Sequence, residues 1–261
     1  GLVGSEMCIR DRWLVVTSFG VDKGPNLSTF FPKAYTLDHY KALLSPDSVN
    51  QFPQWMFNTF IVACFTCVIS TLFVLMVAYA MSCMRFKARK PLMNIAIILN
   101  LFPGFLSMIA VYFIMKQFGL TGTLTGLIIV YSAGSGMGYL IAKGFFDTVS
   151  KSLRESAYLE GANEFTVFWK IILPLSKPIC SVIAIFAINA AWSDFLLPYL
   201  VLRGSALQTV MVRLFVFSTE QTVNADTMMR SVVFSMIPPI ILFFIFQKQL
   251  TENAVSVGIK G

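Results

Sequence analysis

Charged residues are absent from five long stretches of the chain, and each of these stretches is mostly apolar. A helix rises about 1.5 Å per residue, so about 20 apolar residues cross the hydrocarbon core of a bilayer. The uncharged stretches cover residues 48–84, 92–115, 117–142, 178–193 and 231–247. They predict membrane-spanning helices at about 54–83, 92–115, 122–144, 179–202 and 229–249.

The overall composition agrees with this pattern. Hydrophobic residues make up 56% of the chain and charged residues only 13%, and the mean hydropathy is +0.73. Soluble domains carry about 25% charged residues. Helices satisfy their own backbone hydrogen bonds inside lipid, so we predict an all-α integral membrane protein. The net charge of +7 is spread along loops between the spans, and we expect no nucleic-acid partner.

The positive charges predict the orientation, because loops on the cytoplasmic side of a membrane carry an excess of Lys and Arg. Alternate loops give two sets of cations, and the denser set of eleven is Arg85, Lys87, Arg89, Lys90, Lys143, Lys151, Arg154, Lys170, Lys177, Lys248 and Lys260. The other set has seven. We therefore expect a multi-pass protein of a cell membrane, most simply a bacterial one, with its C-terminus in the cytoplasm.

The loop between the third and fourth predicted spans contains the signals of two short helices joined by a turn. Ser152 and Glu155 have the spacing of a capping box, which satisfies free N–H groups at a helix start. Gly161 can adopt the left-handed conformation that ends such a helix, and Asn163 can cap the next one. Pro174 is expected to end the second helix, because the residue before a proline is disfavoured in helical geometry. Such an elbow would suit docking to a soluble partner.

The residues of this loop also resemble a known motif: Glu155-Ser156-Ala157, Gly161, Ile171 and Leu173-Pro174 are similar to the EAA loop of ABC importer permeases. Ser156 replaces the usual central alanine, and Glu160 stands where the sugar-type permeases usually have Asp. Further segments resemble the carbohydrate-uptake subfamily, of the maltose and glycerol-phosphate type. They are Phe31-Pro32, residues 35–40, Asn58-Thr59, residues 191–196, Pro238-Pro239 and residues 258–261.

The resemblance implies a type I ABC importer transmembrane domain with six spans, of which about five are visible here. We expect residues 1–19 to be a non-native or truncated start with the remnant of a first span, and 20–53 to be extracytoplasmic. The transmembrane domain would cover 54–249, with the EAA loop at about 147–177, and 250–261 would be a cytoplasmic tail. The implied partners are a second permease subunit, two ABC ATPase subunits and an extracytoplasmic solute-binding protein.

The resemblance also implies which residues couple the chain to an ATPase. Ala157 and Gly161 would permit close approach, while Tyr158, Leu159 and Phe165 could fill a hydrophobic groove. Glu155 either caps its own helix or pairs with a basic residue of the partner. The expected coupling residues are Glu155, Ser156, Ala157, Tyr158, Leu159, Gly161, Ile171, Leu173 and Pro174.

Asp194 is the one acidic residue inside a predicted span, where a charge is costly. It either makes a structural hydrogen bond or lines the solute pathway. Trp192 beside it could be an interfacial anchor or a platform for a sugar ring. Residues that could share this face and line a pathway are Asn189, Trp192, Ser193, Asp194 and Tyr199.

The sequence predicts a sugar importer subunit without catalytic residues, metal ligands or a cofactor of its own. It contains no phosphate-binding G-x-x-x-x-G-K-[ST] motif, so ATP hydrolysis would belong to a partner. Two alternatives remain open. The solute could be an amino acid, a phosphate or a polyamine, or the chain could be a membrane-embedded enzyme, although an enzyme would need clustered titratable residues at one depth.

Overall fold

The computed structural model describes residues 12–20, 34–45, 51–101, 104–134, 138–219 and 225–258, with the side chains of 225–226 and 248–258 excepted. Within these residues all regular elements are helical, and the only β-type pairing among them is a single bridge between Gly20 and Tyr35. The predicted all-α class is therefore confirmed.

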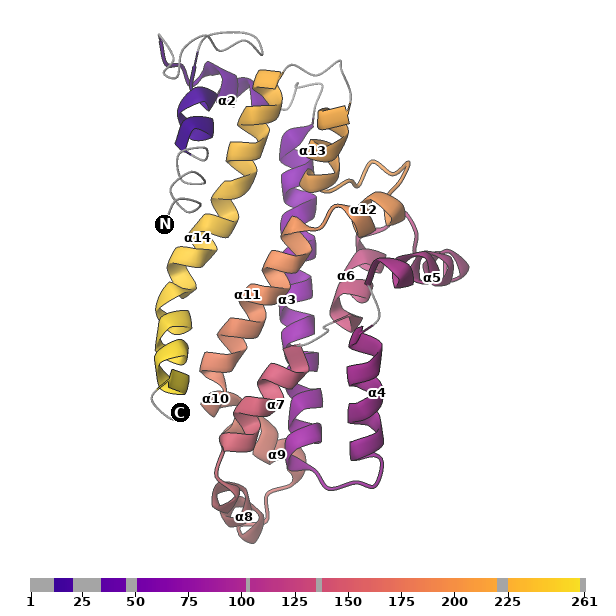
Figure 1. Cartoon of the computed structure of the whole chain (residues 1–261), viewed down its shortest axis with the longest axis vertical. Helices are drawn as coiled ribbons and strands as arrows, with labels where there is room; N and C mark the ends of the chain where they lie inside the picture. Colours follow the sequence, from indigo (N-terminus) through magenta and orange to yellow (C-terminus); the bar gives the residue numbers. More distant parts are fainter. Residues whose placement is uncertain are drawn as a thin grey trace.

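The helix α3 (Phe52–Cys83) runs along the centre of the molecule and contacts most of the other long helices (Figure 1). It begins at Phe52, and the missing N–H of Pro53 is harmless in the first turn. Its surface is apolar on every side: Val62 and Ala78 are fully buried, whereas Phe60 and Phe65 are more than half exposed. A helix that is hydrophobic all round is typical of a membrane span.

Several helices pack against α3. They include α6 (Leu124–Ala133), α7 (Gly138–Thr148), α11 (Lys177–Ser193) and α13 (Val210–Thr219). The long helix α14 (Ala225–Gly258) lies against α11 and runs from the end of the molecule that holds α13 toward the opposite end (Figure 1). Buried side chains form three clusters that follow α3 along its length.

Among the described residues, two helical segments are long and apolar enough to cross a membrane, Phe52–Cys83 and Thr227–Gln247, and the number reaches five if each bent helix pair is one span. The first and last predicted spans therefore agree with the structure. The others are interrupted rather than straight. The second is divided into α4 (Arg89–Leu101) and α5 (Gly104–Gln117), which meet at 103°. In the sequence this break coincides with Pro103-Gly104, a pair unfavourable within a helix.

The third and fourth predicted spans are also broken. The helices α6 and α7 meet at 46°, where the sequence is rich in glycine. The fourth span ends at Ser193, and a short helix α12 (Leu196–Val201) follows. The physical reason is Asp194: its backbone is extended, and its carboxylate accepts a hydrogen bond from the Leu196 N–H at 2.9 Å in place of a helical carbonyl. Asp194 therefore lies at a helix end rather than inside a helix.

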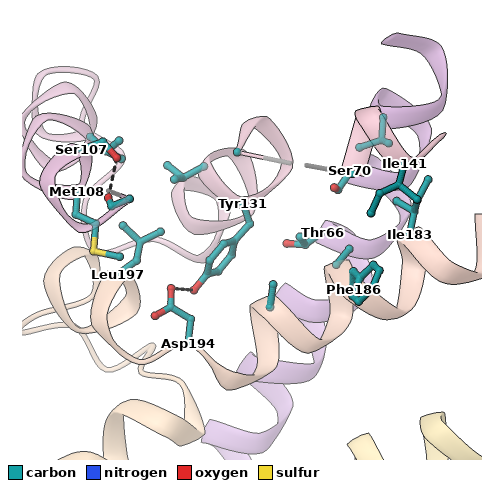
Figure 2. Close-up of a pocket in the computed structure, with 18 residues that line it drawn as sticks. Thr66, Ser70, Ser107, Met108, Tyr131, Ile141, Ile183, Phe186, Asp194 and Leu197 are labelled. Carbon is teal, nitrogen blue, oxygen red and sulfur yellow. Dashed lines mark hydrogen bonds between the residues drawn. The ribbon is translucent and has the colours of Figure 1, made fainter. Parts of the chain in front are cut away.

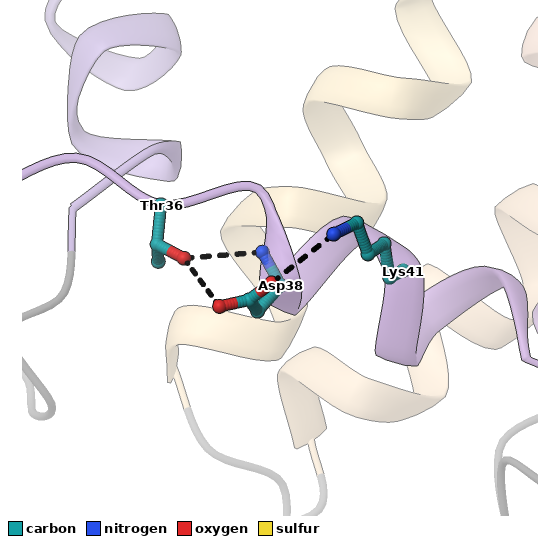
Figure 3. Close-up of polar contacts among 3 residues, drawn as sticks. All are labelled: Thr36, Asp38 and Lys41. Carbon is teal, nitrogen blue, oxygen red and sulfur yellow. Dashed lines mark hydrogen bonds and ion pairs between the residues drawn. The ribbon is translucent and has the colours of Figure 1, made fainter.

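The end of the molecule opposite α8 (Lys151–Leu159) carries two helices that the hydropathy pattern did not predict, namely α13 and the short helix α2 (Asp38–Leu44). Residues 12–18 are helical. At the start of α2, the Thr36 hydroxyl accepts from the Asp38 N–H and donates to the Asp38 carboxylate, which also pairs with Lys41 at 3.4 Å (Figure 3). The Thr36 hydrogen bond and the Lys41 charge lower the pKa of Asp38.

Candidate functional site

The predicted elbow projects from one end of the bundle (Figure 1). Its first arm is α8 (Lys151–Leu159), and its second arm is a continuous helical rod made of α9 (Glu164–Val167), a π-helical turn (Phe168–Ile172) and α10 (Leu173–Leu175). This rod meets α11 at 82°. The structure therefore has the helix–turn–helix geometry that the sequence predicts.

Gly161 forms the corner of the elbow and has a left-handed backbone with φ of 82°. The Gly161 N–H donates to the Tyr158 carbonyl at 3.0 Å, and the Ala162 N–H donates to the Ala157 carbonyl at 2.9 Å. These two bonds form a Schellman motif, which satisfies carbonyls at the end of α8. The predicted roles of Gly161 as helix terminator and of Asn163 as cap are confirmed, since the Asn163 side chain accepts from the Thr166 N–H at 2.8 Å.

Two details of the predicted elbow are wrong. Ser152 and Glu155 do not form a capping box, because α8 begins at Lys151 and the Ser152 hydroxyl instead pairs with the Ser150 hydroxyl at 2.7 Å. Glu155 is exposed and does not cap its own helix.

The second helix ends next to Pro174, at Leu175, as predicted, but not for the predicted reason. Leu173, the residue before Pro174, is helical, with φ of −61° and ψ of −44°. A proline normally clashes with the carbonyl four residues back. The π-helical turn before Pro174 has wider spacing, and the Leu173 N–H donates to the Phe168 carbonyl five residues back. The rod ends at Leu175, and the hydroxyl of the following Ser176 donates to the Ile172 carbonyl at 2.6 Å.

The structure divides the predicted coupling residues between two faces of the elbow. Ala157 is buried, and Ile171 and Leu173 pack against the same cluster of buried side chains, which joins the elbow to α3, α7 and α11. Leu159 is 90% exposed and Phe165 is 69% exposed. Glu155, Ser156, Gly161 and Pro174 are also exposed, as is Tyr158 in part. One face therefore holds the elbow on the bundle, and the other presents apolar side chains outward.

Hydrogen bonds connect the elbow to the end of α3. The Tyr79 hydroxyl donates to the Glu164 carboxylate at 2.6 Å, and the Arg154 guanidinium donates to the Cys83 carbonyl at 2.8 Å. Burial raises the pKa of Tyr158, and the neighbouring Glu164 carboxylate raises it further. Sequence reasoning missed Tyr79 and Glu164. The only available signal was a polar hydroxyl close to the end of an otherwise apolar span.

A second tie joins α3 to α7 just above the elbow. The Asp147 carboxylate accepts from the Ser82 hydroxyl and from the Lys143 ammonium. Together with the apolar cluster, these contacts join the elbow, α3 and α7 into one continuous packed unit.

A cavity of about 580 Å³ lies between α3, α5, α6, α7 and α11 (Figure 2). Asp194 lines it and accepts a hydrogen bond from the Tyr131 hydroxyl at 2.8 Å. Thr66 and Ser70, one helical turn apart on α3, face the same space. Sequence reasoning missed Thr66, Ser70 and Tyr131, although two hydroxyls four residues apart in an apolar helix are a readable signal.

The structure brings only one of the predicted pathway residues to this cavity. Trp192 is buried, and its indole N–H donates to the Ser235 carbonyl of α14 at 3.1 Å. Tyr199 packs edge-to-face on Phe215 with ring centroids 6.0 Å apart. Asn189 and Ser193 are exposed and lie outside the lining of the cavity. Of the set, Asp194 alone combines a structural hydrogen bond with a position at the cavity wall.

An all-helical bundle with apolar outer faces, a cavity between its helices and a projecting elbow has the architecture of a membrane transport subunit. Residues 75–254 match the family described as "Binding-protein-dependent transport system inner membrane component", and the chain belongs to this family. It is therefore an integral membrane permease subunit rather than an enzyme, and it acts in a complex with other transporter components.

Relatives support the assignment over almost the whole chain. The chain is 31% identical to a galactooligosaccharide transport system permease of Bacillus subtilis, covering 95% of this chain and 89% of that protein. It is 29% identical to the maltose/maltodextrin transport system permease of Escherichia coli, covering 95% and 90%. A crystal structure of a bacterial ABC transporter that imports the acidic polysaccharide alginate has a similar fold, with a TM-score of 0.84, 22% identity and coverage of 95% and 92%.

Proposed function

We propose that the chain is a permease subunit of an ATP-driven, binding-protein-dependent importer of sugars. Its working complex would contain a second permease subunit, two ABC ATPase subunits and an extracytoplasmic solute-binding protein. The sugar class is supported by the names of the relatives, which include galactooligosaccharide, maltodextrin and arabinooligosaccharide permeases.

The exposed face of the elbow is the observation that carries this proposal. Leu159 and Phe165 project from a unit whose other face is packed on the bundle. Apolar side chains on a short helix are suited to a hydrophobic groove of a partner. Closure of the ATPase subunits would push on these side chains, and the packed unit behind them would carry the movement into α3, α7 and α11.

The positions of the basic residues support an orientation with the elbow in the cytoplasm. The loop between α3 and α4 and the elbow lie at the same end of the molecule, and α14 runs toward this end (Figure 1). Most members of the denser set of cations belong to these segments. The C-terminal tail 250–261 would then be cytoplasmic, while 20–53 and 203–228 would lie on the extracytoplasmic side, where the solute-binding protein docks.

Reconstitution of the complete importer in proteoliposomes tests this function. Uptake of a radiolabelled neutral oligosaccharide should require ATP on the elbow side and the solute-binding protein on the other side. Uptake that proceeds without ATP and follows an imposed proton or sodium gradient would contradict the proposal, because such uptake defines a secondary transporter.

A further inference from the structure

The cavity beside Asp194 has the size and the lining of a small-molecule site. Its volume of about 580 Å³ lies within the range of about 300–1,000 Å³ that is usual for ligand pockets. Most of its wall is apolar, with Met108, Val130, Ile183 and Leu197 among the lining residues. A few polar groups converge on it, which is the arrangement that fixes the orientation of a bound ligand.

Thr66 is the second, independent sign of a ligand. Its side chain is only 2% exposed, and no hydrogen bond reaches its buried hydroxyl oxygen within the described part of the chain. A buried hydroxyl without a partner is costly, and helix α3 does not satisfy it through a neighbouring carbonyl. Figure 2 shows this hydroxyl directed toward Tyr131 across the cavity. A ligand hydroxyl placed there would satisfy it.

The Asp194 carboxylate supplies the opposite wall. Its two oxygens accept hydrogen bonds from the Tyr131 hydroxyl and the Leu196 N–H, which leaves further lone pairs for donors of a ligand. Asp194 is the only charged residue among the described residues that line the cavity. A hydroxyl is therefore a good partner for this wall, whereas a carboxylate or phosphate of a solute would face an uncompensated like charge in a low-dielectric space.

We propose that this chain itself holds a solute subsite, formed by Thr66, Ser70, Tyr131 and Asp194, that takes a neutral, hydroxyl-rich sugar and excludes anionic saccharides. The inference rests on the proposed function as a sugar importer and adds to it a direct contact and a selectivity. The aromatic rings of Tyr131 and Phe186 provide apolar surface for the C–H face of a sugar ring.

Transport kinetics of the complete importer in proteoliposomes test the subsite. The probes are maltotriose, galactotriose and arabinotriose as neutral solutes, trigalacturonate as an anionic one and spermidine as a cationic one. Thr66→Val removes the hydroxyl at nearly constant shape, and the loss of an unpartnered buried hydroxyl leaves the fold intact. Thr71→Val is the matched control, because Thr71 belongs to the same helix but not to the cavity lining.

We expect the wild-type importer to carry at least one neutral trisaccharide and neither charged probe. Thr66→Val should raise the KM for that trisaccharide about 3- to 10-fold with the maximal rate unchanged, as expected for one lost hydrogen bond. Thr71→Val should leave the KM unchanged. Asp194→Asn removes the charge but keeps an oxygen for the Leu196 N–H, and it should permit measurable uptake of trigalacturonate.

The possible results distinguish failure of the proposed subsite from failure of the proposed function. If the Thr66→Val and Thr71→Val importers take up the neutral trisaccharide with the same KM, the proposed subsite is wrong, but the proposed sugar importer is not affected. Uptake of trigalacturonate by the wild-type importer would overturn the proposed selectivity, and uptake of spermidine in place of the trisaccharides would overturn the sugar class. If none of the neutral trisaccharides were carried, the sugar class itself would be refuted, and the subsite with it.

Discussion

The elbow and the helix pair α4–α5 differ in how tightly they are held by the rest of the described structure. The elbow packs through Ala157, Phe168 and Ile172 on a cluster that includes side chains of α3, α7 and α11, and it is tied to α3 by hydrogen bonds. By contrast, α4 contains no buried residue among those described, and Met115 is the only one in α5. The same chain therefore contains a firmly joined unit and a pair of helices with mostly free apolar faces.

This difference has a mechanical meaning in a membrane protein. Apolar helix faces without a protein partner are stable next to lipid or another subunit, so α4 and α5 need no internal packing. Transmission of force does require internal packing, because packed cores shift as units rather than deform gradually. The contrast predicts that changes in the elbow unit alter coupling, whereas similar changes elsewhere alter only stability or solute binding.

The largest effect is expected for Gly161→Pro. Proline cannot adopt the φ of 82° at this corner and has no N–H for the Tyr158 carbonyl. We expect ATP-driven uptake to be lost while the protein still inserts, as measured by uptake and by membrane abundance in parallel. Gly119→Pro is the matched control, because Gly119 has a φ of 67° and its N–H donates to the Lys116 carbonyl at 3.2 Å, but it lies between α5 and α6. Unchanged uptake in the Gly161 variant would refute the role of the corner.

Removal of the Tyr79 hydroxyl should weaken coupling without loss of packing. Tyr79→Phe retains the ring in the apolar cluster and removes only the hydrogen bond to Glu164. A net hydrogen bond is worth about 1 kcal/mol, so we expect the number of solutes carried per ATP to fall by up to about fivefold. Tyr112→Phe on α5 is the matched control and should leave this ratio unchanged. A normal ratio in the Tyr79 variant would mean that the bond is not part of the transmission.

A smaller effect is expected for Asp194→Asn, and it should appear in transport rather than in abundance. The carboxylate joins α12 to α6 through Leu196 and Tyr131, but an amide can retain both contacts. We expect uptake to fall by about threefold more than membrane abundance does, in keeping with a change at a solute-facing wall. Parallel measurement of uptake and abundance decides this point. Equal losses of both would assign Asp194 a purely structural role.

The smallest effect is expected at the opposite end from the elbow. The Asp38 carboxylate is fully exposed, and its pKa is lowered by Thr36 and Lys41, so its contribution is present at neutral pH and declines as the pH falls through the lowered pKa. Exposed pairs of this kind contribute little. Asp38→Asn should therefore leave uptake at pH 7 unchanged. A strong loss of uptake would instead show that the start of α2 takes part in transport, which would contradict the expectation that only the elbow unit alters coupling.

The helical membrane class and the elbow could both be predicted from the sequence, because both depend on local signals. Stretches without charge predict spans, and Gly161 and Asn163 specify a turn and a cap through backbone geometry that few residues can replace. The breaks within the spans could not be predicted from the sequence. Charge-free stretches report length and hydropathy, so they do not distinguish one straight span from α4 and α5 at 103°.

Tertiary contacts account for the remaining differences. Pro174 is tolerated because a π-helical turn precedes it, and that turn is stabilised by burial of Phe168 and Ile172 rather than by a sequence signal. Trp192 was expected beside Asp194 on one face, but the helix ends between them and its indole bonds to α14. Tyr131 and Thr66 belong to helices far apart in the sequence, and only packing brings them to one cavity.

Contact between the exposed face of the elbow and an ATPase subunit is the central claim, and photo-cross-linking measures it most directly. Leu159 would be replaced by p-benzoylphenylalanine in the assembled importer, with the same replacement at Phe57 as control. Phe57 is 60% exposed and lies about 39 Å from the elbow end of α3, at 1.5 Å per residue. We expect a cross-link to the ATPase subunit from position 159 and none from position 57. An importer that is active but gives no cross-link from position 159 would contradict it.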